Sequence, residues 1–306
     1  MTPLRVEGWG PHARRFATRH CVGRIAAVFE RSLHIEANGD FLCLGDASIG
    51  RGPLNAFVST EAWARLGRAV PPVGSTVLVD HRRFRIGPAS INIAEAKLWR
   101  PAPWPLAPDR RRVAEGVDRF TQLCVARAPG DGLARMVLAP TVGSGTALER
   151  VALPRIGRMR AWLDACRFPP AHHTPPVDLL GLGPGLTPSG DDVLCGALVA
   201  LHAVGRADAL GLLARAIDKA APAATSRLSG AFLRAAAEGL GAEPLHETIC
   251  ELLSGRAESL ARHLEALGHI GHTSGWDALA GAVLVLQAFG TIAVQSAGVA
   301  SSELSL

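Results

Sequence analysis

The residues best suited to chemistry lie in one glycine-rich stretch, LLGLGPGLTPSGDDVLCG, at positions 179–196. It carries two neighbouring carboxylates, Asp191 and Asp192, behind a run of glycines that includes Gly183 and Gly185. Glycine adopts backbone angles that other residues avoid, so such a turn folds tightly and lets a ligand approach its peptide groups. Carboxylates beside it can contact a ligand, transfer a proton or coordinate a hard cation.

A helix should begin within this stretch. Thr187 or Ser189 can cap it, and Pro188 suits its first turn. The backbone N–H groups that follow, near Gly190, would point outward with the positive end of the helix dipole, which attracts anions. Residues 177–180 are a candidate short strand that leads into the glycines. The sequence therefore predicts an anion-binding helix start.

The pattern recurs 85 positions further along the chain. SGDDVLCG at 189–196 and SGWDALAG at 274–281 agree at Ser, Gly, Asp, Leu and Gly. Ser and Asp lie three apart, and Asp and the second Gly four apart, so all three occupy one helical face. The small glycines allow another helix backbone to come close. We predict two packed helices whose starts converge on one pocket, with Asp192 and Asp277 facing each other or a shared ligand.

The aspartates have three interpretations that the sequence leaves open, namely capping of the helix start, ligand contact and metal coordination. The repeated motif lies beside His272, and a histidine side chain can give or take a proton in catalysis. Our candidate catalytic residues are therefore Asp192, Asp277 and His272, and no metal-ligand set or cofactor is identified. Thr225 and Ser226 precede another predicted helix, where they cap it or bring hydroxyls to the same pocket. The candidate ligand-binding residues are Gly183, Gly185, Thr187, Ser189, Gly190, Asp191, Thr225, Ser226, Thr273, Ser274 and Gly275.

The motifs GLGPGLTPSGDD (181–192) and GHTSGWDALAG (271–281) resemble the paired signatures of a domain-of-unknown-function family that includes AllH, a subunit of oxamate carbamoyltransferase. The resemblance extends to residues 225–229 and, loosely, to a β-rich start. It implies participation in carbamoyl transfer between carbamoyl phosphate and oxamate, together with other subunits, and assigns no catalytic residue. The alternative is a noncatalytic regulatory or assembly protein that senses a small anionic ligand. Whether this chain is itself an enzyme stays open.

Composition narrows the possible partners. The chain has 306 residues, of which 48% are hydrophobic, so it can build a sizeable core. The net charge is +5, but only two of the 32 basic residues are lysines. This skew is typical of a GC-rich genome, and we expect no nucleic-acid partner. The six cysteines form no C-x-x-C pair. The N-terminus lacks a secretory signal, and the apolar span 278–300 is interrupted by polar residues, so we expect a cytoplasmic protein with no membrane partner.

The positioning elements fall into two predicted domains. Residues 1–100 show short alternating strands, with a hairpin turn at Asn38-Gly39, and indicate a barrel or sandwich. Arg51 lies in a turn there that is either plain or touches an anion. Residues 101–108 contain four prolines and form a stiff linker. A mainly helical domain follows at 109–306, which makes the fold class α+β. Helical patterns cover 109–127, 146–168, 191–204, 207–221, 226–239, 245–254, 257–267 and 275–294.

Overall fold

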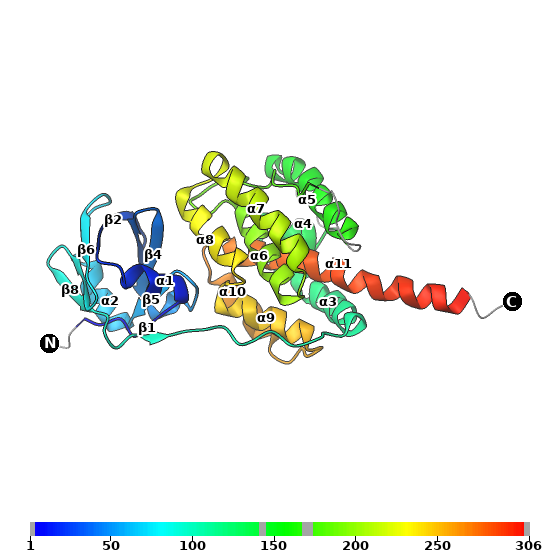
Figure 1. Ribbon diagram of the computed structural model, residues 1–306, viewed down its shortest axis with the longest axis horizontal. Coiled ribbons are helices and arrows are strands. Elements are labelled where there is room, and N and C mark those ends of the chain that lie inside the picture. Colours follow the sequence, from blue (N-terminus) through cyan, green and yellow to red (C-terminus); the bar gives the residue numbers. More distant parts are fainter. Residues whose placement is uncertain (1–3, 141–144, 167–173, 303–306) are drawn as a thin grey trace. The chain divides into compact units, whose positions relative to one another are not determined.

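The computed structural model describes residues 4–140, 145–166 and 174–302. The chain divides into two compact units, Met1–Pro101 and Ala102–Leu306. Strands fill the first unit and helices fill the second, so the predicted α+β class is confirmed (Figure 1).

The first unit is built on one nine-stranded sheet with the order β8-β7-β6-β2-β3-β4-β5-β1-β9. Its strands are β1 (Gly8–Trp9), β2 (Cys21–Val28), β3 (Ser32–Ala37), β4 (Asp40–Asp46), β5 (Asn55–Val58), β6 (Thr76–Val79), β7 (Arg83–Ile86), β8 (Ala89–Asn92) and β9 (Lys97–Leu98). The pairs β4–β5 and β1–β9 are parallel, and the other neighbours are antiparallel.

The strand sequences explain this sheet. In β3, β6 and β7 every second side chain is buried, as expected where one face packs on a core and the other meets water. The predicted hairpin turn is confirmed, because Asn38 and Gly39 both have positive φ angles, 53° and 84°. Near the two ends of the sheet, Val6 N–H donates to the Asn92 carbonyl and Asn92 N–H donates to the Leu4 carbonyl, each at 2.8 Å. The sheet therefore curls towards a closed barrel.

The first unit also contains helical segments that the sequence did not predict. They are α1 (Pro11–Ala17), α2 (Thr60–Gly67) and the short 3-10 helix η1 (Ala47–Ile49). Phe16 and Trp63 from α1 and α2 are buried in the same core as the inward side chains of the sheet. These helices cover apolar surface that the sheet alone would leave exposed.

The second unit is an assembly of helices around one core. Its helices are α3 (Arg110–Val125), α4 (Ala134–Leu138), α5 (Ala147–Ala165), α6 (Ser189–Ala203), α7 (Ala207–Ala224), α8 (Arg227–Ala237), α9 (Glu243–Leu253), α10 (Leu260–Gly268) and α11 (Ser274–Ser302). All except α4 were predicted, within a few residues at most ends. The predicted end of α5 at residue 168 lies outside the described residues. Residues 177–180 form turns rather than the expected strand, so that prediction is wrong.

Local signals set where these helices begin. The Asp109 carboxylate accepts hydrogen bonds from two backbone N–H groups at the start of α3. Thr146 and Glu149 form a reciprocal capping box on α5. The proline-rich segment before α3 has no regular structure, and its Trp104 ring stacks on His246 of α9 with ring centroids 4.4 Å apart. Part of the predicted linker is thus fastened to the helical unit.

Two helices, α6 and α11, form the middle of this unit. They pack on each other, while α7, α8 and α9 contact α6 and α3, α4 and α5 contact α11 (Figure 1). Thirteen of the 15 residues of α6 are buried, because neighbouring helices surround it. Among the described residues, no helix is both long and apolar enough to span a bilayer.

Candidate functional site

The two motif copies meet where α6 and α11 begin. A Cβ atom placed on Gly196 would lie 1.7 Å from the carbonyl oxygen of Ala278, and one on Gly281 would lie 1.8 Å from that of Val193. Only glycine fits at such distances. The prediction that these glycines let two helix backbones approach closely is confirmed.

Each motif supplies a hydroxyl to the carboxylate of the other. Ser274 hydrogen-bonds with Asp192, and Ser189 hydrogen-bonds with Asp277. The exchange is reciprocal, so the two helix starts converge, while the pocket expected between them stays a prediction. The expectation that Thr187 or Ser189 caps α6 is wrong, because Pro188 occupies the N-cap position and no side chain caps this helix. The Ser189 hydroxyl hydrogen-bonds to Asp277 of α11 instead of to a backbone N–H group of α6.

Asp192 and Asp277 are deeply buried, with 8% and 0% of their surface exposed. Burial raises the pKa of both carboxyls, and for Asp192 the negative charges of Asp277 and Asp191 raise it further, well above its ordinary value. Within the described part of the chain, neither Oδ2 atom accepts a hydrogen bond of normal geometry. At least Asp192 therefore tends to keep its proton at a pH where an exposed aspartate is ionised.

We predict that Asp192→Asn gains stability relative to the wild type as pH rises. The pKa of Asp192 in the folded protein lies above the unfolded value of 3.8. The stability that the protonated carboxyl contributes is therefore fully present below the unfolded pKa. It is lost as pH rises through the folded pKa, whereas asparagine does not titrate. Urea unfolding between pH 4 and pH 8 should show the difference growing by about 1 kcal/mol or more in favour of Asp192→Asn. Exposed Asp118→Asn is the control, and a flat difference for Asp192→Asn would contradict the burial described.

Asp191 is tied to the protein by both of its carboxylate oxygens. Oδ1 accepts the Gly181 N–H at 2.7 Å, and Oδ2 accepts the hydroxyls of Thr225 and Ser229, the latter at 2.6 Å. The carboxylate is fully buried. Of the interpretations left open for Asp191, these bonds favour a structural one, because it joins α6 to the glycine turn and to the start of α8.

Asp277 has a partner that the sequence did not reveal. Leu133 N–H donates to its Oδ1 at 2.7 Å across 144 positions of the chain. Gly132 makes this possible with a φ of +79°, since a Cβ there would lie 2.7 Å and 2.8 Å from the two carboxylate oxygens. Gly130 and Gly132 flank Asp131 in the sequence, and nothing in their spacing points to Asp277.

The structural repeat extends further back than the sequence repeat. Leu182 N–H donates to Leu179 and Ile270 N–H donates to Leu267, each at 3.0 Å, so both helices are preceded by the same turn. Gly190 N–H donates to the Leu182 carbonyl at 2.8 Å, and its counterpart Gly275 donates to Ile270 at 3.2 Å. These two amides, which were expected to hold an anion, are already used by the turns.

The copies differ in the loop between turn and helix. Gly183 to Ser189 spans six positions, whereas Gly271 to Ser274 spans three. The additional length forms an exposed loop at Pro184, Gly185 and Leu186. Gly183 and Gly185 have φ angles of +114° and +95°, and a Cβ on Gly185 would meet no atom within 4 Å. This loop departs from the internal symmetry and is open to other molecules.

Polar groups connect this loop to its neighbours. Thr187 and Ser274 hydroxyls lie 3.2 Å apart, and Ser226, the N-cap of α8, donates to the Leu186 carbonyl at 2.6 Å. His272 Nε2 lies 3.1 Å from Asp131 Oδ2, with both side chains largely exposed. We call this set the rim; it consists of Asp131, Leu186, Thr187, Ser226, His272, Thr273 and Ser274. Two rim residues contact the buried carboxyls, Ser274 that of Asp192 and Thr273 that of Asp277. Neither cavity described for this structure is lined by the rim.

The structure thus sorts most of the predicted residues into two groups. Ser189, Gly190, Asp191, Asp192, Gly275 and Asp277 are buried, while Thr187, Ser226, His272, Thr273 and Ser274 reach the half-buried or exposed rim. In the described ranges, no three His, Cys, Asp or Glu residues are grouped so as to hold a metal ion.

Comparison with known families adds to this geometry. Residues 179–286 match the family model described as oxamate carbamoyltransferase subunit AllH. The match begins at the turn before α6 and ends within α11, so it takes in both motif copies and confirms the resemblance they carry. The nine-stranded sheet lies outside it. No solved structure matches the chain.

Proposed function

We propose that this chain is a subunit of an oxamate carbamoyltransferase-like complex and that its rim binds a small anionic metabolite. The main support is a coincidence of position, because the segment similar to AllH is the segment that builds the helix pair and most of the rim. The two serine–aspartate exchanges fix that helix pair, and with it the spacing of the hydroxyls above.

The reaction sets clear requirements. The nitrogen of oxamate forms a bond to the carbamoyl carbon, the bond from that carbon to the phosphate oxygen breaks, phosphate leaves, and the nitrogen gives up a proton. An enzyme must orient the two reactants, donate hydrogen bonds to the carbamoyl oxygen and accept the proton. The Thr187 hydroxyl is proposed to donate one of these hydrogen bonds, because the hydroxyls of Ser226 and Thr273 are engaged with the Leu186 carbonyl and the Asp277 carboxyl. His272, held by Asp131, is suited to accept the proton.

The phosphate needs positively charged groups nearby, and the residues that define the rim include no arginine or lysine. Arg227 directly follows Ser226, whereas Arg206, the residue before α7, bonds to Asp208 and to the Cys166 carbonyl. We infer that a partner subunit contributes the missing positive charge. The exposed loop around Leu186, 45% exposed, is the surface we assign to that partner.

Asp192 and Asp277 have a positioning role in this proposal. Each lies behind a serine at the start of the opposite helix, and burial keeps them from a ligand at the rim. Their contribution is to hold Ser189 and Ser274 in place, while His272 is the residue proposed to touch the reacting groups.

The function is tested on His272→Gln in the complex assembled with its partner chains. We expect oxalurate formation from carbamoyl phosphate and oxamate to fall at least about tenfold, because proton transfer contributes on the order of 10²–10⁴-fold. The unfolding midpoint should not change, since the side chain is 83% exposed. The matched control is His269→Gln. His269 is exposed, lies between α10 and α11 as His272 does, and has no part in the proposed reaction.

The result also separates the two functions. Loss of turnover with intact assembly and stability supports the catalytic subunit. A noncatalytic regulatory or assembly protein is supported instead if this chain binds oxamate or carbamoyl phosphate, measured by calorimetry, while His272→Gln and Thr187→Val leave turnover unchanged.

A further inference from the structure

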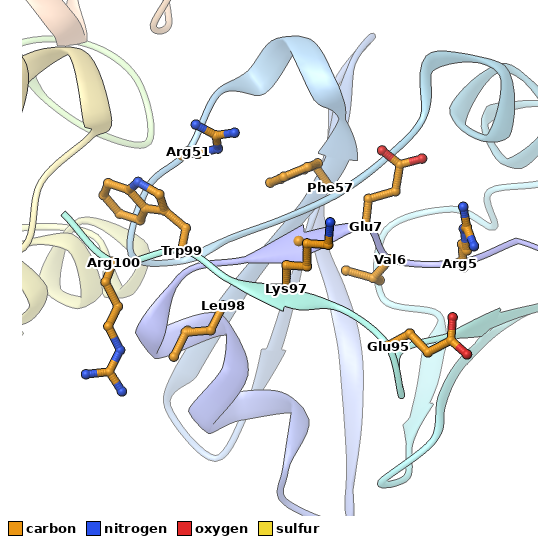
Figure 2. Close-up of a pocket in the computed structure, with 11 residues that line it drawn as sticks. Arg5, Val6, Glu7, Arg51, Phe57, Glu95, Lys97, Leu98, Trp99 and Arg100 are labelled. Carbon is orange, nitrogen blue, oxygen red and sulfur yellow. The ribbon is translucent and has the colours of Figure 1, made fainter. Parts of the chain in front are cut away.

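The first unit contains a hollow that no part of the proposed function uses. It has a volume of about 770 Å³ and is lined from three strands, the chain before β1, the turn at Arg51 and the residues after β9 (Figure 2). Ligand pockets are typically about 300–1,000 Å³, which is several times the volume of a two-carbon acid such as oxamate. The hollow therefore suits a larger guest.

Gly8 is one of the residues that line this hollow. In the sheet, Gly8 of β1 lies opposite Phe57 of β5 on one side and opposite Lys97 of β9 on the other. Directly opposed residues point to the same face. A Cβ on Gly8 would lie 2.6 Å from the tip of the Phe57 ring, so the absence of a side chain lets that ring lie across the middle strand. An aromatic surface and a lysine consequently border the same space.

Positive charge and a second aromatic ring complete the lining. Figure 2 shows Arg51 and Trp99 on one side of the hollow, with Phe57 and Lys97 beside them, while Arg100 points away. Lys97 is exposed and forms no ion pair with any carboxylate in the described ranges. Glu7 lies beside Phe57 and Lys97, while Glu95 and Arg5 lie at the other end (Figure 2). Both signs of charge therefore line the hollow, and Arg51 and Lys97 are the cations next to the aromatic rings.

We propose that this hollow binds a ring-bearing organic anion of the nucleoside phosphate class. A planar base can stack on Trp99 or Phe57, an interaction worth about 1–3 kcal/mol per base in single-stranded nucleic-acid complexes. The phosphates are then held by the guanidinium of Arg51, whose planar fork matches phosphate oxygens, and by the ammonium of Lys97. The proposal is independent of the rim, which belongs to the helical unit.

The two lysines of the chain provide an internal control. Lys97 lies in the hollow, and Lys219 is an exposed residue of α7 in the other unit. The full-length chain is treated with a limiting amount of an amine-acetylating reagent, with or without ADP, and acetylation at each lysine is measured by mass spectrometry. ADP should slow the modification of Lys97 at least threefold and leave that of Lys219 unchanged. Adenosine and pyrophosphate, each with one half of the recognition chemistry, should protect less.

Each outcome decides the proposal. Equal protection of both lysines, or none at millimolar ADP, overturns it, and protection by pyrophosphate equal to that by ADP removes the part assigned to the rings. Arg51→Ala should abolish the protection, whereas Arg68→Ala, an exposed arginine elsewhere in the same unit, should keep it. Gly8→Ala should weaken protection by pushing the Phe57 ring into the hollow, and intact far-ultraviolet circular dichroism would show that the variant folds.

Discussion

Gly281→Ala is expected to destabilise the protein by about 3 kcal/mol or more, although it adds a single methyl group. The new Cβ would lie 1.8 Å from the Val193 carbonyl oxygen and 3.0 Å from the Ala197 nitrogen. Backbone atoms cannot rotate away as a side chain can, so α6 and α11 would have to separate. Denaturant unfolding of the purified chain measures the loss.

Gly157→Ala is the matched control for this substitution. Gly157 also lies within a helix, α5, but a Cβ there meets no atom within 4 Å. Alanine should stabilise this exposed helix position by about 0.5–1 kcal/mol. If both variants shift stability alike, the two central helices do not approach as described, and the repeated glycines have no structural explanation.

Asp191→Ala is expected to cost about 3 kcal/mol or more. The substitution leaves the Gly181 N–H and the hydroxyls of Thr225 and Ser229 without their shared acceptor inside the protein. The glycine turn and the start of α8 would lose the group that joins them. Thermal unfolding provides the measurement.

Asp118→Ala is the comparison for that loss, because Asp118 is an exposed helical aspartate and its removal should change stability by less than about 0.5 kcal/mol. An Asp191→Ala variant as stable as Asp118→Ala would mean that Asp191 is not the connector described. Asp191 would then again be a candidate ligand-binding residue.

Most of the helical fold could be predicted, because its signals are local or repeated. Asp109 and Thr146 begin α3 and α5 by capping, and the Asn38-Gly39 turn sets the first hairpin. The convergence of α6 and α11 was predictable for a different reason. The spacing of Ser, Asp and Gly placed the same groups on one face of each helix, and the glycines indicated close approach.

The missed features depend on distant contacts. The short helices α1 and α2 are stabilised by burying Phe16 and Trp63 against the sheet, which a local pattern does not reveal. The bond from Leu133 to Asp277 joins residues far apart in sequence. The direction of the Ser189 hydroxyl was also mistaken, because the local capping rule was outweighed by a buried carboxylate on the neighbouring helix.

This division also changes how the motif is understood. Its most repeated letters, the serines, aspartates and second glycines, are those that pack the helices together. The residues that differ between the two copies include the exposed loop 184–186 and the neighbouring Thr187 in the first copy, and the exposed His272 in the second. The proposed chemistry therefore depends on the part of the motif where the two copies differ.

The most direct test of the proposed function is to leave this chain out. The partner subunits are purified with and without it, and oxalurate formation from carbamoyl phosphate and oxamate is followed. We predict no turnover above background without the chain, full recovery when the wild-type chain is added back, and little recovery with His272→Gln. Equal turnover with and without the chain would contradict the assignment of this protein to the carbamoyl-transfer complex.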